Sequence, residues 1–129
     1  MINVTCAIVI KETKVLVTQR SSTMKLPLKW EFPGGKIEAN ESSEQCIHRE
    51  LKEELNIEIQ ILKSQDPVPY TYEHFTINLI PFIARYLSGK VVLTEHKEYR
   101  WLEKEELKSL DWAPADIPVL EKFLKLHHD

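Results

Sequence analysis

The sequence predicts an α/β protein in which helices flank a mixed β-sheet. Three observations support this prediction: an N-terminal segment rich in Val, Ile and Thr, an amphipathic segment of helical periodicity in the middle of the chain, and later strand-like segments that end in a helical C-terminus. Strands interspersed with helices are typical of a sheet covered by helices. At 129 residues, the chain is expected to form a single domain over residues 1–129.

The N-terminal third predicts strands and a turn. Residues 3–10 and 14–20 are rich in β-branched side chains and flank the polar KETK, which indicates a hairpin. After a polar loop, the stretch KWEF leads into PGG at residues 33–35. This tripeptide predicts a turn, because both glycines can adopt backbone conformations closed to other residues.

The strongest helical pattern follows Ser42. Ser42 and Gln45 have the spacing of a capping box, and apolar residues recur at every fourth position from Ile47 to Leu55. These features predict one amphipathic helix of about 13 residues. Asn56 stands where many helices end in a left-handed residue, and Asn can replace Gly there.

The second half of the chain predicts further strands and two helices. Ile57, Ile59 and Ile61 alternate with polar residues, and FTINLIPFIARYL and EYRWL also have strand patterns. KEELKSL predicts a short helix. DIPVLEKFLKLHH predicts a C-terminal helix that begins near Asp116 and Pro118.

Composition and charge narrow the range of possible functions. No apolar run approaches the roughly 20 residues that cross a membrane, so we expect no membrane association. The formal net charge of −3 and the pI of about 6.0 argue against duplex nucleic acid as a partner. Cys6 and Cys46 lack CxxC spacing, which argues against zinc and favours a reducing compartment, by default the cytoplasm. A small phosphorylated ligand carried by a metal ion is compatible with these properties.

The segment RELKEELN places Glu50, Glu53 and Glu54 on one short helix, where like charges at neighbouring positions repel each other. The one lysine of the helix lies on the far side, whereas Arg49 can reach Glu53 and neutralise one carboxylate of the three. A solvated charged face is the ordinary explanation of such a cluster. Because the cluster borders the apolar stripe, we instead expect it to bind a hard cation such as Mg²⁺, which prefers oxygen ligands.

These residues resemble the Nudix box, which consists of G, five residues, E, seven residues and then RE, an aliphatic residue, x, EE, x, G and an aliphatic residue. Gly35, Glu41 and RELKEELNI match it over residues 35–57, except that Asn56 replaces Gly. The resemblance extends to EFPGGKIE, to TQR ending at Arg20, to EHKEYRW and to WAPADIPVLEKF, which are similar to the MutT-type branch and its CTP pyrophosphohydrolase and 8-oxo-dGTP diphosphatase members. It implies a Nudix α/β/α sandwich.

The resemblance also implies the site residues. The implied metal ligands, for Mg²⁺ or Mn²⁺, are the carbonyl of Gly34 and the carboxylates of Glu50, Glu53, Glu54 and Glu95. The implied catalytic residues are Glu53, Glu50, Arg49, Glu95 and Lys36, with Glu53 and Glu95 as candidates for the general base. The implied substrate-binding residues are Asp116, Arg20, Phe32, Lys36 and Phe75. Glu38 and Glu41 are expected to have supporting roles.

The implied reaction is hydrolysis of a nucleoside triphosphate to the monophosphate and pyrophosphate. Oxidised purines such as 8-oxo-dGTP fit the branch. An ionised Asp116 only accepts hydrogen bonds, which favours a base edge that donates them, such as the cytosine of CTP, dCTP or 5-methyl-dCTP. Alternatives are a hydrolase of dinucleotide polyphosphates or nucleotide sugars, and a non-catalytic sensor of nucleotides or RNA. The oligomeric state is expected to be a monomer or a homodimer.

Several candidates also have plainer structural explanations. Asp116 can act as a helix N-cap, Arg20 as half of a surface ion pair, and Glu95 as part of an exposed turn. Phe32 and Phe75 can belong to the core, as most aromatic residues of strands do. The five histidines have no spacing typical of metal ligands, and His96 is expected on the surface or in packing.

Overall fold

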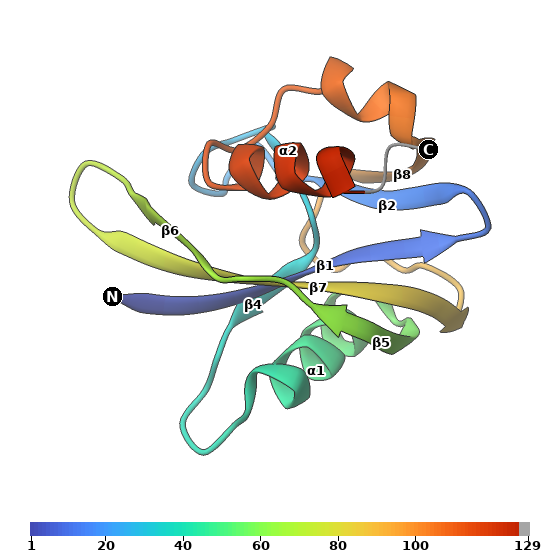
Figure 1. Ribbon diagram of the computed structural model, residues 1–129, viewed down its shortest axis with the longest axis horizontal. Coiled ribbons are helices and arrows are strands. Elements are labelled where there is room, and N and C mark those ends of the chain that lie inside the picture. Colours follow the sequence, from blue (N-terminus) through green and yellow to red (C-terminus); the bar gives the residue numbers. More distant parts are fainter. Residues whose placement is uncertain (127–129) are drawn as a thin grey trace.

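The computed structural model of the protein describes residues 1–126 and shows a twisted sheet with helices on both sides (Figure 1). The elements in chain order are β1 (Ile2–Lys11), β2 (Lys14–Gln19), β3 (Trp30–Glu31), β4 (Gly34–Lys36), α1 (Ser43–Leu55), β5 (Glu58–Ser64), β6 (Val68–Thr71), β7 (Thr76–Ser88), β8 (Glu98–Glu103), the 3₁₀ helix η1 (Lys104–Ser109) and α2 (Asp116–Leu126). His127 and His128, expected in the last helix, lie outside the described residues. No helix within residues 1–126 is both long and apolar enough to cross a membrane.

Strand β1 lies at the centre of the sheet. It pairs in parallel with β7 and antiparallel with β2 and β4. Strands β5 and β6 pair antiparallel with β7, while β3 and β8 pair antiparallel with β2. The sheet is therefore mixed, and the predicted α/β class is confirmed.

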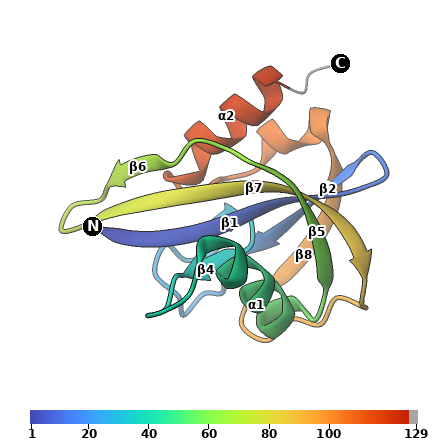
Figure 2. The same ribbon diagram turned by 60° about the horizontal axis from the view of Figure 1, so that its bottom comes forward.

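The two helices cover opposite faces of the sheet, as Figures 1 and 2 both show. Successive residues of β1 point to opposite faces, so Ala7 and Val9 pack in the cluster under α1, while Ile8 packs in the cluster under α2. The predicted stripe of α1 is fully buried in the first cluster, through Ile47, Leu51 and Leu55. The cluster under α2 contains Val119, Leu120 and Phe123 of that helix. These two apolar layers define the α/β/α sandwich.

Both ends of α1 agree with the prediction made from the sequence. The hydroxyl of Ser42 accepts a hydrogen bond from the backbone N–H of Gln45 at 3.0 Å, and the side chain of Gln45 accepts one from the N–H of Ser42 at 2.8 Å. This is the predicted capping box. Asn56 has φ of 61° and ψ of 34°, the left-handed conformation that ends the helix.

The predicted role of the two neighbouring glycines is wrong. Gly34 and Gly35 lie in strand β4, and among the described residues Gly89 is the glycine with a positive φ. Lack of space explains both residues instead. A Cβ atom at Gly34 would lie 1.9 Å from the carbonyl oxygen of Thr5, and one at Gly35 would lie 2.3 Å from the carboxyl carbon of Glu50. The glycines let β4 lie flat against β1 and α1.

Two other elements differ from the prediction. KEELKSL forms a 3₁₀ helix, η1. Strand β6, which contains Pro69, was not among the predicted strands. β6 pairs with β7 beyond the main path of the sheet and forms a hairpin with it, which extends past the sheet in Figure 1.

Candidate active site

A cleft of about 360 Å³ brings together residues from distant parts of the chain. Of the predicted site residues, it is lined by Arg20, Phe32, Gly34, Lys36, Glu54, Phe75 and Asp116. Two residues to which the sequence assigned no role in the site, Glu31 and His96, also line it. The helix α1, which carries the remaining glutamates of the RELKEELN segment, lies beside one end of this cleft.

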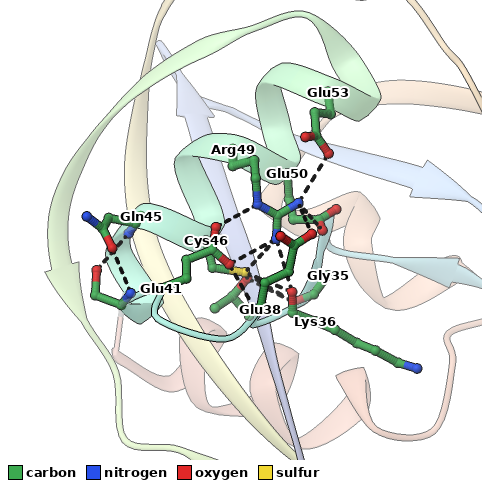
Figure 3. Close-up of polar contacts among 11 residues, drawn as sticks. Gly35, Lys36, Glu38, Glu41, Gln45, Cys46, Arg49, Glu50 and Glu53 are labelled. Atoms are coloured by element: carbon green, nitrogen blue, oxygen red, sulfur yellow. Dashed lines mark hydrogen bonds and ion pairs between the residues drawn. The ribbon is translucent and has the colours of Figure 1, made fainter.

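The guanidinium of Arg49 lies at the centre of a group of carboxylates (Figure 3). Its Nε and Nη2 atoms donate to the two oxygens of Glu41 at 2.6 and 3.0 Å. Its Nη1 atom lies 3.0 Å from Oε1 of Glu50, 3.1 Å from Oε2 of Glu53 and 3.4 Å from Oε1 of Glu38. The predicted pair of Arg49 with Glu53 is confirmed, and the same Nη1 atom also contacts Glu50, which was not predicted.

These contacts fix the charge states on this side of α1. Hydrogen bonds from Arg49 lower the pKa of Glu41 to about 2. In turn, Glu41 and then Glu50 raise the pKa of Arg49 above its usual value. Nη2 of Arg49 also donates to the carbonyl of Lys36 at 3.2 Å, which ties the helix to the end of β4. The ammonium group of Lys36 points away from the carboxylates in Figure 3.

Glu54 is in the opposite situation. Its side chain is 18% exposed, and burial raises its pKa to about 9, with further contributions from a hydrogen bond and the charge of Glu50. The charges of Glu95 and Glu31 add to this effect. Glu95 itself is exposed, in the bend before β8. Three other carboxylates, those of Glu50, Glu95 and Glu31, therefore disfavour the ionised form of Glu54.

The donor chemistry around Glu54 fits a divalent cation, because carboxylate oxygens are the ligands that hard cations prefer. Burial, followed by Glu50 and the charges of Glu95 and Glu31, raises the pKa of Glu54, and a bound cation would stabilise its ionised form. Within residues 1–126, no group of three or more His, Cys, Asp or Glu side chains is arranged so that it could hold a metal ion. Arg49 contacts one oxygen of Glu50 and one of Glu53.

The other end of the cleft is built on Asp116, the first residue of α2. Asp116 is only 7% exposed, and its Oδ2 accepts a hydrogen bond from the backbone N–H of Phe32 at 2.9 Å. This bond goes to another segment of the chain, which differs from the N-cap alternative. Burial and then the charge of Glu31 raise the pKa of Asp116 well above its usual value.

The two predicted stacking residues differ in exposure. Phe32 is 2% exposed and packs against Trp112, with ring centroids 4.8 Å apart, so its ring belongs to the core. Phe75 is 40% exposed and stacks on Tyr72 at 5.3 Å. Only the ring of Phe75 is therefore open to a ligand, while Phe32 contributes its backbone N–H to Asp116.

Glu31 and His96 lie between Arg20 and Glu54 in the lining of the cleft. Arg20 forms an ion pair with Glu31 at 2.9 Å, and both side chains are largely buried, so the alternative of a surface pair is only partly right. Of the two positions expected for His96, on the surface or in packing, the structure shows the buried one: the residue is 8% exposed, and its Nε2 lies 2.8 Å from Oε2 of Glu31. Its neighbour Glu95 in the EHKEYRW segment was the available signal.

Comparison with known proteins places this site in a family. A family model described as NUDIX domain matches residues 1–123. The chain is 36% identical over 126 residues to the CTP pyrophosphohydrolase of Escherichia coli (strain K12), covering 98% of this chain and 93% of that protein. It is 30% identical over 116 residues to the 8-oxo-dGTP diphosphatase of the same strain, covering 90% of each. The crystal structure of the MutT protein from Methanosarcina mazei Go1 has a TM-score of 0.88 at 25% identity, covering 99% of this chain and 96% of that one. The chain therefore belongs to the Nudix family, as a hydrolase of the MutT type.

Proposed function

We propose that the protein is a Mg²⁺-dependent nucleoside triphosphate pyrophosphohydrolase, which hydrolyses (d)NTPs to the monophosphate and pyrophosphate. Its biological role would be sanitation of the nucleotide pool, which protects DNA. One observation carries the proposal: a single cleft of about 360 Å³ is lined both by the acidic Glu54, on what we call its acidic end, and by the buried Asp116, on what we call its nucleoside end. This volume is in the range of small-molecule sites, and the two ends suit phosphates with their cation and a base, respectively.

Nudix hydrolases generally use divalent metal ions. In this protein, the carbonyl of Gly34 and the carboxylates of Glu50, Glu53, Glu54 and Glu95 would hold Mg²⁺, or Mn²⁺ in its place. When bound, the ion supplies neutralisation of phosphate charge and a more acidic water. The fit rests on the carboxylates near Glu54, whose pKa is raised to about 9 by burial and then by Glu50, Glu95 and Glu31.

The residues of the chain then divide the remaining work. Arg49 orients Glu50 and Glu53 through its Nη1 atom, which contacts both. Glu53 and Glu95 are exposed enough to accept and release the proton of the attacking water, so either can serve as the base. Lys36 lines the cleft and is available to the phosphates.

Cytosine is the base that an ionised Asp116 favours. Its Oδ2 is engaged by the N–H of Phe32, so Oδ1 is the oxygen that would accept from the N4 amino group. The similarity to a CTP pyrophosphohydrolase supports this assignment. The exposed ring of Phe75 would stack on the base.

Oxidised purines such as 8-oxo-dGTP are the second candidate. The raised pKa of Asp116 favours them, because a protonated carboxyl can donate as well as accept. The similarity to 8-oxo-dGTP diphosphatases supports the same candidate.

The experiment that tests the function measures pyrophosphate release with MgCl₂. The panel contains CTP, dCTP, 5-methyl-dCTP, dGTP and 8-oxo-dGTP, together with a dinucleotide polyphosphate and a nucleotide sugar. Glu53→Gln and added EDTA serve as inactive controls. Wild-type release no higher than that of Glu53→Gln would favour the non-catalytic sensor. Asp116→Asn should shift the preference between cytosine and oxidised guanine, and equal rates on all bases in both proteins would remove base recognition by Asp116.

We also propose that the protein works in the cytoplasm on free nucleotides, as one domain over residues 1–129 and as a monomer or homodimer. Cys6 and Cys46 are both free and buried, which suits a reducing compartment. Size-exclusion chromatography with light scattering would determine the oligomeric state.

A further inference from the structure

Four polar side chains that line the cleft form a row, from Arg20 through Glu31 and His96 to Glu54. Nη1 of Arg20 lies 2.9 Å from Oε1 of Glu31, and Nε2 of His96 lies 2.8 Å from Oε2 of the same carboxylate. Nδ1 of His96 lies 4.0 Å from Oε2 of Glu54. Each oxygen of Glu31 thus has its own partner, and His96 stands between Glu31 and Glu54.

The environment of His96 is unusual. Its side chain is 2% exposed, and its Nδ1 is, among the described residues, the one buried side-chain N or O atom without a hydrogen-bond partner. A buried polar atom without a partner is costly, so such an atom in a native structure calls for an explanation. Because His96 also lines the cleft, the missing partner can come from the cleft itself.

The direction of each hydrogen bond follows from the partner. An ionised carboxylate only accepts, so Nε2 of His96 carries the hydrogen and donates to Glu31. Nδ1 of the neutral ring is then an acceptor, directed to the side of Glu54. The separation of 4.0 Å is too long for a direct hydrogen bond but suits two groups that share a water molecule or a hydroxyl.

We infer that His96 is a positioning residue that couples the two ends of the cleft. Its Nε2 holds Glu31 against Arg20 at the nucleoside end, and its Nδ1 accepts a hydrogen bond from a water or substrate hydroxyl beside Glu54 at the acidic end. This inference rests on the proposed function, since it assigns the two ends to nucleoside and phosphates.

Two amide substitutions separate the two nitrogens of the ring. The amide of His96→Gln reaches the place of Nε2, and the amide of His96→Asn reaches the place of Nδ1. His96→Gln should keep KM within about twofold and lower kcat about tenfold, whereas His96→Asn should raise KM about tenfold and keep kcat within about threefold. His96→Ala should show both defects.

Further variants test the coupling to Glu31. Glu31→Gln should reproduce the higher KM of His96→Asn, and the double variant should be no worse than either single one, because both remove the same contact. His48, which is exposed on α1, provides matched controls: His48→Gln and His48→Asn should leave both constants unchanged. Thermal unfolding of each variant establishes that it is folded.

Binding of CMP and 8-oxo-dGMP in EDTA, measured by calorimetry, gives a second readout without metal or turnover. His96→Asn should weaken the binding and His96→Gln should retain it. A wild-type protein that hydrolyses no triphosphate would contradict the proposed function, while the binding readout would still decide the role of His96. Indistinguishable effects of the Gln and Asn substitutions in both readouts would overturn the inference, because a packing role does not distinguish the two nitrogens.

Discussion

Two glutamates near opposite ends of α1, Glu41 just before the helix and Glu54 in its last turn, have pKa values shifted in opposite directions. Glu41 accepts two hydrogen bonds from Arg49, which lower its pKa to about 2. Glu54 is buried beside Glu50, which raises its pKa to about 9. Glu50 belongs to both environments, because its Oε1 contacts Arg49 and its carboxyl group also interacts with Glu54.

This difference shows that the acidic cluster is not one uniform surface. The reach of a single guanidinium divides it into an arginine side, formed by Glu38, Glu41 and Glu53 around Arg49, and a histidine side, formed by Glu31, Glu54 and His96. On the arginine side, three carboxylates share one guanidinium. On the histidine side, the buried Glu54 feels the charges of Glu50, Glu95 and Glu31, and there we place the cation and the phosphates.

Replacing Arg49 should have the largest effect, because it removes the difference between the two sides. Arg49→Ala leaves Glu41 and Glu50 without their cation, and we expect a loss of about 3 kcal/mol in the free energy of unfolding and a fall in kcat/KM of about a hundredfold. Arg49→Lys should be intermediate, since an ammonium cannot bind Glu41 through two parallel bonds. Urea denaturation and steady-state kinetics measure both; a lysine variant equal to wild type would show that charge alone suffices.

The two adjacent glycines test how Glu50 is held between the sides. In Gly35→Ala the new Cβ meets the mobile carboxyl group of Glu50, so kcat/KM should fall about tenfold while the free energy of unfolding changes by only about 1 kcal/mol. In Gly34→Ala the Cβ meets the backbone of Thr5, so about 3 kcal/mol of stability should be lost. The same stability loss in both variants would contradict the distinction between side chain and backbone.

The pH dependence of stability should differ in sign between the sides. The raised pKa of Glu54 means that the folded state holds this proton more tightly, so stability declines as pH rises from about 4.5 to about 9. Glu54→Gln should remove that decline and raise Tm by about 5 °C at pH 8, but not at pH 4. Glu41 stabilises the fold above pH 4.5, and this contribution is lost as pH falls towards 2.

A matched Glu41→Gln variant sharpens the pH experiment. It should be less stable than wild type at pH 7 and converge with it near pH 2. Calorimetric scans at a series of pH values without added metal follow both variants. Parallel Tm curves for wild type and Glu54→Gln would show that Glu54 has an ordinary pKa.

The smallest effect is expected at Asn56, which ends α1 and contacts neither the arginine side nor the histidine side. Asn56→Gly keeps the left-handed conformation but loses the bonds of Asn56 with Lys52 and Lys90, so stability should change by less than about 0.5 kcal/mol. Asn56→Ala should cost about 1 kcal/mol. Both should retain wild-type kcat/KM; a large loss of activity in Asn56→Gly would give this position a role beyond ending the helix.

The sequence by itself determined the helix α1 and its position in the fold. Its capping box, its apolar stripe and its left-handed Asn56 depend on residues within a few positions of each other, and such contacts hold in almost any tertiary setting. The Nudix box likewise lies in one continuous segment, so membership of the family was predictable. The contact of Arg49 with Glu53 belongs to the same local class.

Only the tertiary structure decided how that helix is completed into a site. Asp116 and Phe32 are 84 positions apart, and His96 and Glu31 are 65 apart, so no local pattern joins them. Their meeting depends on the pairing of β3 with β2, the packing of α2 and the course of the bend before β8. The ionisation of Glu54 depends on the same long-range arrangement, because burial and neighbouring charges, and not the residue type, set its pKa.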